Sequence, residues 1–382
     1  LYLHFRMLRC IEEKLLYVPE EKNPTENIRR YMIEIQKGNE LEQSEEKQKG
    51  KENALATINF ALGDLFFYKA RNKYTNRFTE GVDDKEELYQ KAREYYDLQD
   101  SFGDPLGAWN RAQVNRELLK LDKDNTELKK DIYEDAVNAV KDEKEIWEDI
   151  NNIDEYYKKI PEYDLHFASR MGAIQNQMGI VYSEGIGTNI NLIEAKKCFR
   201  EGMKNHYAYS YNRLAQAHEK VVIDNMKRIM RGEEKDLKRT MKVIEEEYVT
   251  AFVVFWLQIQ TLQESYAMNR VSWYVLEGIT IKLRNDEIND KNEEIFNVEE
   301  DKESGLSKVS MRLQLDWLSE CFDQKLYKTI MDTQDIKKLR KFVTNQGKIK
   351  RDIEWWLEQA AFAGNTFAAE RLKKLKNKQL AF

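Results

Sequence analysis

The stretch IQNQMGIVYSEGIGTNINLIEAKKCFREGMKNHYAYSYNRL, residues 174–214, determines the expected fold. It predicts a short amphipathic helix, a break at Gly185-x-Gly187, a second amphipathic helix and the start of a third. Apolar or small residues recur in the second helix at spacings of three and four, at Leu192, Ala195, Phe199 and Met203. Two short helices cannot cover their own apolar faces, so this hairpin is expected to stack against similar neighbours.

The residue types inside this hairpin suit close helix packing. Small residues at Gly179 and Ala195 let two antiparallel backbones approach each other. The glycines of the break supply the positive φ that ends one helix and reverses the chain. Either Asn189 or Asn191 is then placed to cap the next helix through its side-chain oxygen.

The order of these residues matches a known repeat. The matching positions are Gly179, Tyr182, Gly185, Gly187, Asn191, Ala195, Phe199, Ala208, Asn212 and Leu214. Together they resemble a Sel1-like repeat, a relative of the tetratricopeptide helical hairpin. Ala215 stands where the next unit would place its first glycine, and 215 minus 179 gives a period of 36. Two positions depart from the family pattern, because Cys198 replaces an aromatic residue and His206 a glycine.

Two other parts of the chain carry the same pattern. In the first, Gly63 lies in the expected first helix, and the second helix and its exit are matched by Ala92, Tyr95, Tyr96, Gly103, Asp104 and Asn110. In the last, the matching residues are Trp356, Ala360, Ala361, Gly364, Asn365, Ala368 and Leu372. The interval from the small helix residue to the exit is 11 residues in each copy: 92 to 103, 195 to 206, and 353 to 364, where isoleucine replaces alanine. The resemblance covers about half of the chain.

The resemblance implies an all-α fold, an α-solenoid of stacked antiparallel helical hairpins that forms a right-handed Sel1-like or TPR-like superhelix. Residues 1–50 are expected to form a helical cap and a flexible loop. Residues 51–220 are expected to form Sel1-like repeats with a degenerate helical insertion. Residues 221–382 are expected to form diverged hairpins, an acidic loop at 285–304 and a terminal Sel1-like repeat.

Three segments of the second half carry more specific expectations. The apolar window YVTAFVVFWLQI, residues 248–259, is too short to span a membrane and is expected to be a buried helix. Residues 266–283 and 311–322 are expected to be helical. The stretch 285–304 is acidic and has little apolar content, which favours a surface loop.

Composition favours a helical protein without a membrane span. The 382 residues include only four prolines, and 34% of them are charged, so helix breakers are rare. A mean hydropathy of -0.76, with no apolar run of about 18 residues, argues against a transmembrane helix. The net charge of -6 gives no overall attraction to nucleic acid or anionic lipid.

Cysteine usage and the first residue bear on localisation. Cys10, Cys198 and Cys321 lie far apart, which fits reduced thiols in a cytoplasmic protein. The chain begins with Leu1 instead of methionine, so we expect that an upstream segment is missing, and secretion stays open. An effector domain in such a segment would make this chain the sensor half of a larger polypeptide.

No cofactor or metal site is predicted. The four histidines are scattered, and no paired cysteines suggest zinc. The Gly185-x-Gly187 break lacks the preceding strand and the following lysine of a phosphate-binding loop, and a turn explains both glycines.

A nucleic-acid function is the alternative that the sequence leaves open. Arg213-x4-His218 has the arginine-to-histidine spacing of the HEPN class of helical ribonucleases, and the two side chains are interpreted as roughly adjacent on one helix. Basic residues also cluster within 227–242, 337–351 and 373–378, although solvated helix faces explain such clusters more simply. This alternative is a nucleic-acid-binding or HEPN-like ribonuclease module of a bacterial defence or toxin system.

The preferred function is a non-enzymatic scaffold or adaptor that binds a protein or peptide on the concave face of the array. The first helix of each pair lines that face, which gives as exposed candidates Gln175, Gln177, Tyr209 and Arg213. A structural role in the repeats is expected for Gly63, Ala92, Gly103, Gly179, Gly185, Gly187, Ala195, Ala208, Ala360, Gly364 and Ala368. The resemblance does not identify the partner.

Overall fold

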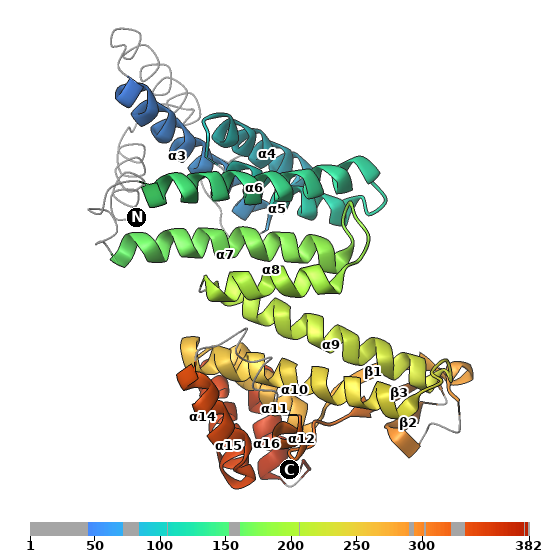
Figure 1. Cartoon of the computed structure of the whole chain (residues 1–382). Helices are drawn as coiled ribbons and strands as arrows, with labels where there is room; N and C mark the ends of the chain where they lie inside the picture. Colours follow the sequence, from blue (N-terminus) through green and yellow to red (C-terminus); the bar gives the residue numbers. More distant parts are fainter. Residues whose placement is uncertain are drawn as a thin grey trace. The chain divides into compact units, whose positions relative to one another are not determined.

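The computed structural model of the chain describes residues 45–71, 84–104, 106–152, 161–205, 207–289, 294–301, 303–321, 333–377 and 379–380 (Figure 1). The helices expected before residue 45 lie outside these residues. The chain divides into two compact units, Leu1–Cys198 and Phe199–Phe382. Each unit is described by itself.

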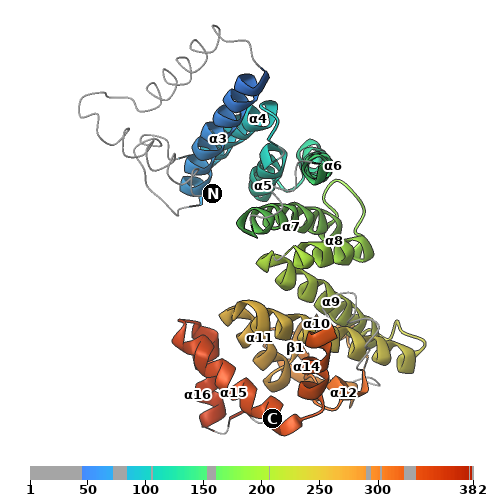
Figure 2. The same cartoon turned by 60° about the vertical axis from the view of Figure 1, so that its left-hand side comes forward.

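The first unit is a stack of long helices that follow one another in the chain. They are α3 (Glu45–Ala70), α4 (Lys85–Ser101), α5 (Leu106–Leu121), α6 (Thr126–Asn152) and α7 (Pro161–Glu184), with α8 (Leu192–Lys204) containing the boundary between the units. From α3 to α7, each helix packs on the next, and Figure 2 shows this order. One continuous cluster of buried apolar side chains runs from α3 to the turn after α7. The predicted helical class is therefore confirmed, and neighbouring helices share one core as a hairpin stack requires.

Close backbone approach in this stack depends on small residues. Gly63 of α3 is buried directly against the ring of Tyr96 on α4, and a Cβ atom at Gly63 would lie within 2.8 Å of three atoms of that ring. Ala92, one turn before Tyr96, has no exposed surface. Phe66 and Tyr95 stack beside this contact with their ring centroids 5.6 Å apart. The contact between Gly63 and the Tyr96 ring thus fixes how α3 and α4 lie against each other.

The turn between α7 and α8 has the geometry of a helix reversal. Gly185 and Gly187 have φ values of 68° and 67°, which only glycine adopts without strain. Gly187 also lies against the backbone carbonyl of Lys129 on α6, so a side chain at this position would collide with the neighbouring helix. Asn191 then caps α8, because its Oδ1 accepts a hydrogen bond from the Glu194 amide at 3.1 Å.

The second unit is built around a long apolar helix. Its helices are α9 (Ala208–Met230), α10 (Leu237–Leu262), α11 (Ser265–Leu276), α12 (Trp317–Glu320), α14 (Thr333–Val343), α15 (Gln346–Phe362) and α16 (Thr366–Lys376). Every residue from 248 to 259 in α10 is buried, which confirms the expected buried helix. Helix α10 packs between α9 and α11, and α11 in turn packs on α15. None of the helices among the described residues combines the length and apolar character needed to cross a bilayer.

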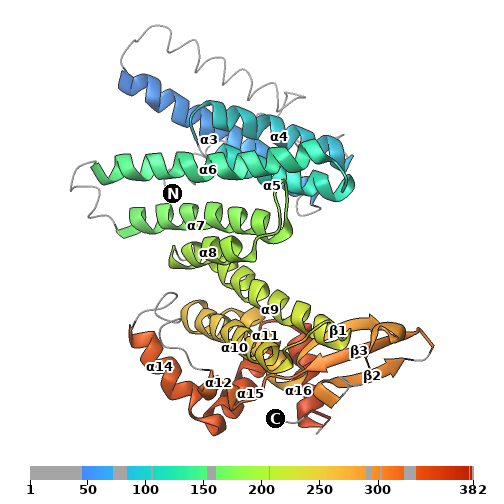
Figure 3. The same cartoon turned by 45° about the vertical axis from the view of Figure 1, so that its right-hand side comes forward.

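A small antiparallel sheet in the second unit was not expected. Strands β1 (Ile279–Arg284), β2 (Asn297–Asp301) and β3 (Leu306–Met311) are arranged in the order β1-β3-β2 (Figure 3). Tyr248 of α10 joins the sheet to the helices, because its hydroxyl accepts from the Ile279 amide at 3.0 Å and donates to the Met311 carbonyl at 3.1 Å. The all-α description therefore holds for the helical framework and has this sheet as a local addition.

Three sequence expectations fail at the sheet. The helix expected over 266–283 ends at Leu276, and the helix expected over 311–322 is reduced to α12. The acidic stretch 285–304 is not a loop throughout, because it contains β2. The physical reason is alternation: Ile279, Ile281 and Leu283 are buried while Lys282 and Arg284 are exposed, which is the period of a strand. The acidic side chains of β2 stay in solvent, where their charge costs little.

We predict that Gly63→Ala destabilises the first unit. The added methyl group would collide with the Tyr96 ring, so the free energy of unfolding should fall by about 1–3 kcal/mol despite the helix preference of alanine. Urea denaturation followed by circular dichroism measures the change.

Gly347→Ala is the matched control for this substitution. Gly347 is also in a helix, but a Cβ atom at this position would lie 3.7 Å from its nearest neighbouring atom, which is an ordinary contact distance. This variant should be unchanged or more stable by up to about 1 kcal/mol. Equal destabilisation by the two substitutions would contradict the tight contact at Gly63.

Candidate functional site

One side of α9 holds two of the predicted partner-binding residues, of which Tyr209 is exposed as expected and Arg213 is half-buried. Tyr209, Arg213 and Gln216 are spaced by four and then three residues, so they lie on one stripe of the helix. Tyr209 has 64% of its surface exposed, which is high for a large aromatic side chain. The opposite face of α9 is buried and includes Leu214 and Ala215, neither of which has exposed surface.

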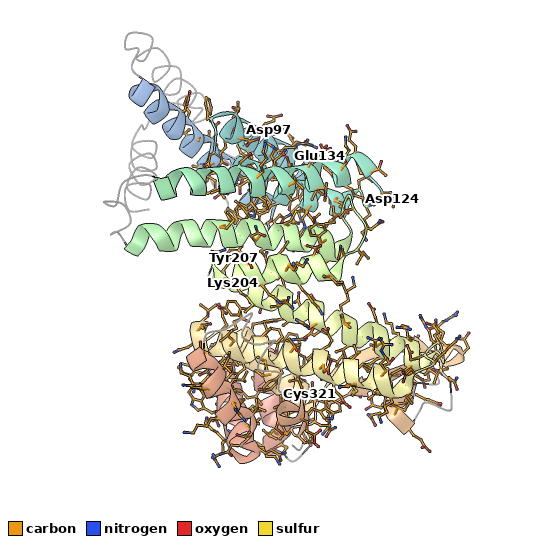
Figure 4. The ribbon with its side chains drawn as sticks, in the orientation of Figure 1. Asp97, Asp124, Glu134, Lys204, Tyr207 and Cys321 are labelled. Carbon is orange, nitrogen blue, oxygen red and sulfur yellow. The ribbon has the colours of Figure 1, made fainter. Side chains whose placement is uncertain are left out.

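Neighbouring helices hold this stripe in place. The Gln258 side chain on α10 donates to the Ala208 carbonyl at 3.4 Å, which ties the first turn of α9 to α10. The Gln216 amide donates to the Tyr266 hydroxyl of α11, also at 3.4 Å. The rings of Tyr207 and Tyr209 lie 5.6 Å apart at the start of α9, where Figure 4 labels Tyr207. We call Tyr209, Arg213, Gln216 and Tyr266 the α9 surface; all four are exposed or half-buried.

The two predicted glutamines lie on α7, in the first unit. Gln175 is half-buried, and its amide donates to the sulfur of Met171 at 3.8 Å. Gln177 has only 3% of its surface exposed, and its carbonyl oxygen accepts from Arg116 of α5 at 3.3 Å. The expectation that Gln177 is exposed is therefore wrong. Because α7 packs against both α5 and α6, the side that carries Gln177 faces a neighbouring helix.

The predicted repeat residues lie at packing and turn positions. Ala92, Ala195, Ala360 and Ala368 have no exposed surface, Gly179 is buried and Ala208 is half-buried. Gly103 and Gly364 have φ values of 80° and 88° at the ends of α4 and α15. The residue aligned with them, His206, lies outside the described residues.

The arginine and histidine of the ribonuclease alternative do not form a joint site. His218 has 4% of its surface exposed, and its Nδ1 atom lies 2.5 Å from a carboxylate oxygen of Glu247 on α10. Arg213 lies on the other side of α9, because a five-residue step turns the helix by about 140°. The interpretation of the two side chains as adjacent is therefore wrong, and His218 serves the contact between α9 and α10.

Several residues of the basic clusters are already neutralised by carboxylates. Arg228 pairs with Glu234 at 2.7 Å, and Arg231 pairs with Glu287 at 3.1 Å. Farther along the chain, three more cation–carboxylate pairs are formed by Lys338 with Asp335, Lys374 with Glu277, and Lys376 with Glu358. Basic side chains that are paired with carboxylates attract phosphate more weakly than unpaired basic side chains converging on one groove.

An acidic cleft in the first unit could not be found from the sequence. It has a volume of about 370 Å³ and is lined by Glu86, Gln90, Arg93, Leu118, Leu121, Asp122, Asn125, Glu127, Leu128 and Asp131. Its single arginine, Arg93, pairs with Asp131 at 3.1 Å, so carboxylates dominate its charge. The lining comes from α4, the end of α5 and the start of α6, and only the packing of these helices brings it together. This cleft would repel nucleic acid.

A half-buried arginine joins three helices of the first unit through an ionic network. Arg111 of α5 contacts Asp100 of α4 at 2.6 Å, Asp97 of the same helix at 3.2 Å, and Asp135 of α6 at 2.8 Å. Burial alone would lower the pKa of Arg111, but the hydrogen bonds and charges of Asp135 and Asp100 raise it. Figure 4 labels Asp97 on α4. The network joins three consecutive helices, so Arg111 has a structural role in the stack. Among the described residues, no group of three potential ligands is placed to hold a metal ion.

Comparison with known proteins finds a similarity in structure but none in sequence. The sequence matches no family model and no curated protein. Its structure is similar to that of a Sel1 repeat protein from Oxalobacter formigenes, with 14% sequence identity, coverage of 58% of this chain and 79% of that chain, and a TM-score of 0.22. A similarity at this TM-score carries no argument about family or function.

We predict that one carboxyl group makes the first unit less stable as the pH rises. Asp64 of α3 is half-buried and accepts a hydrogen bond from the Tyr96 hydroxyl at 2.6 Å. Burial raises the pKa of Asp64 from 3.8 to about 6, against the smaller lowering effect of that bond. Because the folded state holds the proton more tightly, the stabilisation is complete below pH 3.8 and is lost as the pH rises to about 6. The loss is at most about 3 kcal/mol.

Asp64→Asn tests this dependence by urea denaturation at several pH values. The amide oxygen still accepts from Tyr96 but cannot ionise, so stability should vary less with pH over that window. The exposed Asp124, between α5 and α6, gives the control Asp124→Asn, which should keep the slope of the unaltered protein. An unchanged slope in Asp64→Asn would contradict the buried-carboxyl explanation.

Proposed function

We propose that the protein is an interaction scaffold whose α9 surface binds a peptide segment of another protein. The observation that carries this proposal is the stripe formed by the exposed Tyr209 and the half-buried Arg213 and Gln216, on a helix whose other side is packed against its neighbours. The helical framework supports the proposal, because stacked hairpins present helix faces as extended rigid surfaces.

The residue types of the α9 surface suit peptide recognition. Tyrosine and arginine are enriched among the residues that dominate binding energies, because they combine large contact area with hydrogen bonding. Tyr209 and Tyr266 offer ring faces. Arg213 donates to the Gln216 side chain at 3.5 Å, and a guanidinium has five N–H donors, so it can also bind a carbonyl or carboxylate of a peptide. The buried face of α9 holds these side chains on a fixed support, so little ordering energy is lost on binding.

Selection from a random peptide library displayed on phage tests the proposal. The full chain should enrich a consensus peptide, and Tyr209→Ala should weaken the affinity for that peptide about tenfold or more, since aromatic anchors contribute about 2 kcal/mol. Arg213→Ala should weaken it in the same direction. Affinity is measured by fluorescence anisotropy with the synthetic consensus peptide.

Leu237→Ala is the control for this experiment. Leu237 is 39% exposed at the start of α10, whereas the first turn of α9 contacts Gln258 near the other end of α10. Replacement of Leu237 should therefore leave the affinity unchanged. If no consensus is enriched, the peptide-binding function is wrong. If the consensus binds Tyr209→Ala and unaltered protein equally well, the α9 surface is not the site.

Labelled RNA provides the test of the rival function. We expect no cleavage and only weak binding, because His218 is buried and the basic segments carry paired carboxylates. Binding that falls steeply as salt is raised, or cleavage that is lost in His218→Ala, would favour the nucleic-acid function instead.

A further inference from the structure

The outward face of α15 carries an ordered stripe of aromatic and charged residues. The stripe consists of Lys348, Arg351, Trp355, Glu358 and Phe362, spaced alternately by three and four residues. All five are exposed; Trp355 has 53% and Phe362 has 94% of its surface in solvent. The opposite face of the helix is buried and holds Ile349, Ile353, Trp356, Leu357 and Ala360. We call the five exposed residues the α15 stripe.

The other hairpins show that this face is normally polar. Trp355 lies two residues after Ile353, and the same step from Ala92 and Ala195 leads to Glu94 and Lys197. Both of those residues are exposed.

The second aromatic residue of the stripe departs from the repeat in the same way. Phe362 lies nine residues after Ile353, and the same step from Ala92 and Ala195 leads to the exposed Ser101 and Lys204. The last hairpin alone of the three places aromatic rings where the others place polar groups. Trp355 and Phe362 therefore add exposed aromatic surface to a helix side that is polar at the same positions of the other two hairpins.

The charges of the stripe are ordered along the helix. Lys348 and Arg351 precede Trp355, and Glu358 follows it. If a second, antiparallel copy is centred on Trp355, Arg351 of each copy meets Glu358 of the other, and Lys348 meets Phe362. These contacts are an ion pair and a cation–π contact, and each occurs twice in a two-fold symmetric pair.

We propose that the α15 stripe is a self-association surface, on which two copies of this chain pair through antiparallel α15 helices. The alternating spacing of three and four keeps all five side chains on one face, along which a second helix can lie. The order of charges favours an identical partner, because a two-fold axis brings each basic half against an acidic half without any other protein. The parallel arrangement is disfavoured, since it would place like charges opposite each other.

Contacts within the chain leave this pairing open. The Lys348 ammonium lies beside Asp352 and 5.6 Å from the Phe342 ring, at one edge of the stripe. One oxygen of Glu358 accepts from Lys376 of α16 at 3.1 Å. The second carboxylate oxygen of Glu358 is available to an arginine of the other copy, since a carboxylate accepts on both oxygens. The surface is separate from the α9 surface, so its failure would leave the proposed function untouched.

Sedimentation equilibrium of the full chain over a range of micromolar concentrations tests the pairing. The mass should rise from that of one chain, 45.5 kDa, toward twice that value. Arg351→Glu and Glu358→Arg should each weaken the association about tenfold or more, because each places like charges opposite each other twice. Phe362→Lys, which copies the residue of α8 at this position, should weaken it as well.

Mixing the two charge variants gives the sharpest result. In each variant alone, residues 351 and 358 carry charges of the same sign. An Arg351→Glu chain and a Glu358→Arg chain are complementary at these two positions, so their mixture should regain the doubled mass. Recovery on mixing also shows that both variants are folded. Ile193→Lys, at a 71% exposed position of α8, is the control that should not alter association.

Three results would overturn the pairing. The first is a mass of one chain at every concentration, which would leave the stripe to a different protein. The second is association that neither charge variant weakens, which would place the contact elsewhere. The third is a mixture of the variants that stays at the mass of one chain.

Discussion

Neighbouring helices must approach closely enough to share one core, and this constraint governs the structure. In proteins, most of the stability of a helix comes from packing its apolar face, and a hairpin of two helices still exposes such a face. The contact of Gly63 with the Tyr96 ring and the absence of exposed surface at Ala92 show how the approach is achieved. Larger residues at these positions would separate the helices and leave the shared core loosely packed.

Buried charges in the stack follow from the same closeness. Arg111 lies where α4, α5 and α6 meet, and three carboxylates compensate its charge. Removing these carboxylates would leave a half-buried arginine uncompensated, which is unfavourable. In the second unit, Glu219 of α9 plays a comparable part, since it accepts from both Arg270 and Tyr274 of α11. Polar groups here specify which helices pair, while apolar contacts supply most of the stabilisation.

Local patterns in the sequence predict local structure well and fail where distant residues decide the outcome. The glycine turn, the cap at Asn191 and the buried helix over 248–259 are each encoded within a few residues. Gln177 is different, because only the packing of α7 against α5 shows that its side is covered.

The sheet was missed for a related reason. The strand segments are only five or six residues long, and helical segments lie on both sides of them in the chain. A short apolar alternation cannot be told from a helix end unless its strand partners are known. The acidic cleft likewise depends on how α4, α5 and α6 face each other, which the order of residues does not reveal. The separation of Arg213 and His218 is different, because it follows from their five-residue step along one helix.

A repeat provides its own standard for judging an exposed residue. Exposed apolar side chains are common on any protein, so exposure gains weight only when it is combined with a second observation. In a repeat, however, the same position in other copies shows what the fold itself requires. Where two copies place glutamate, serine or lysine and a third places tryptophan or phenylalanine, packing does not explain the change. The proposed pairing of two α15 helices accounts for both aromatic residues, because it gives each of them a partner that the single chain does not supply.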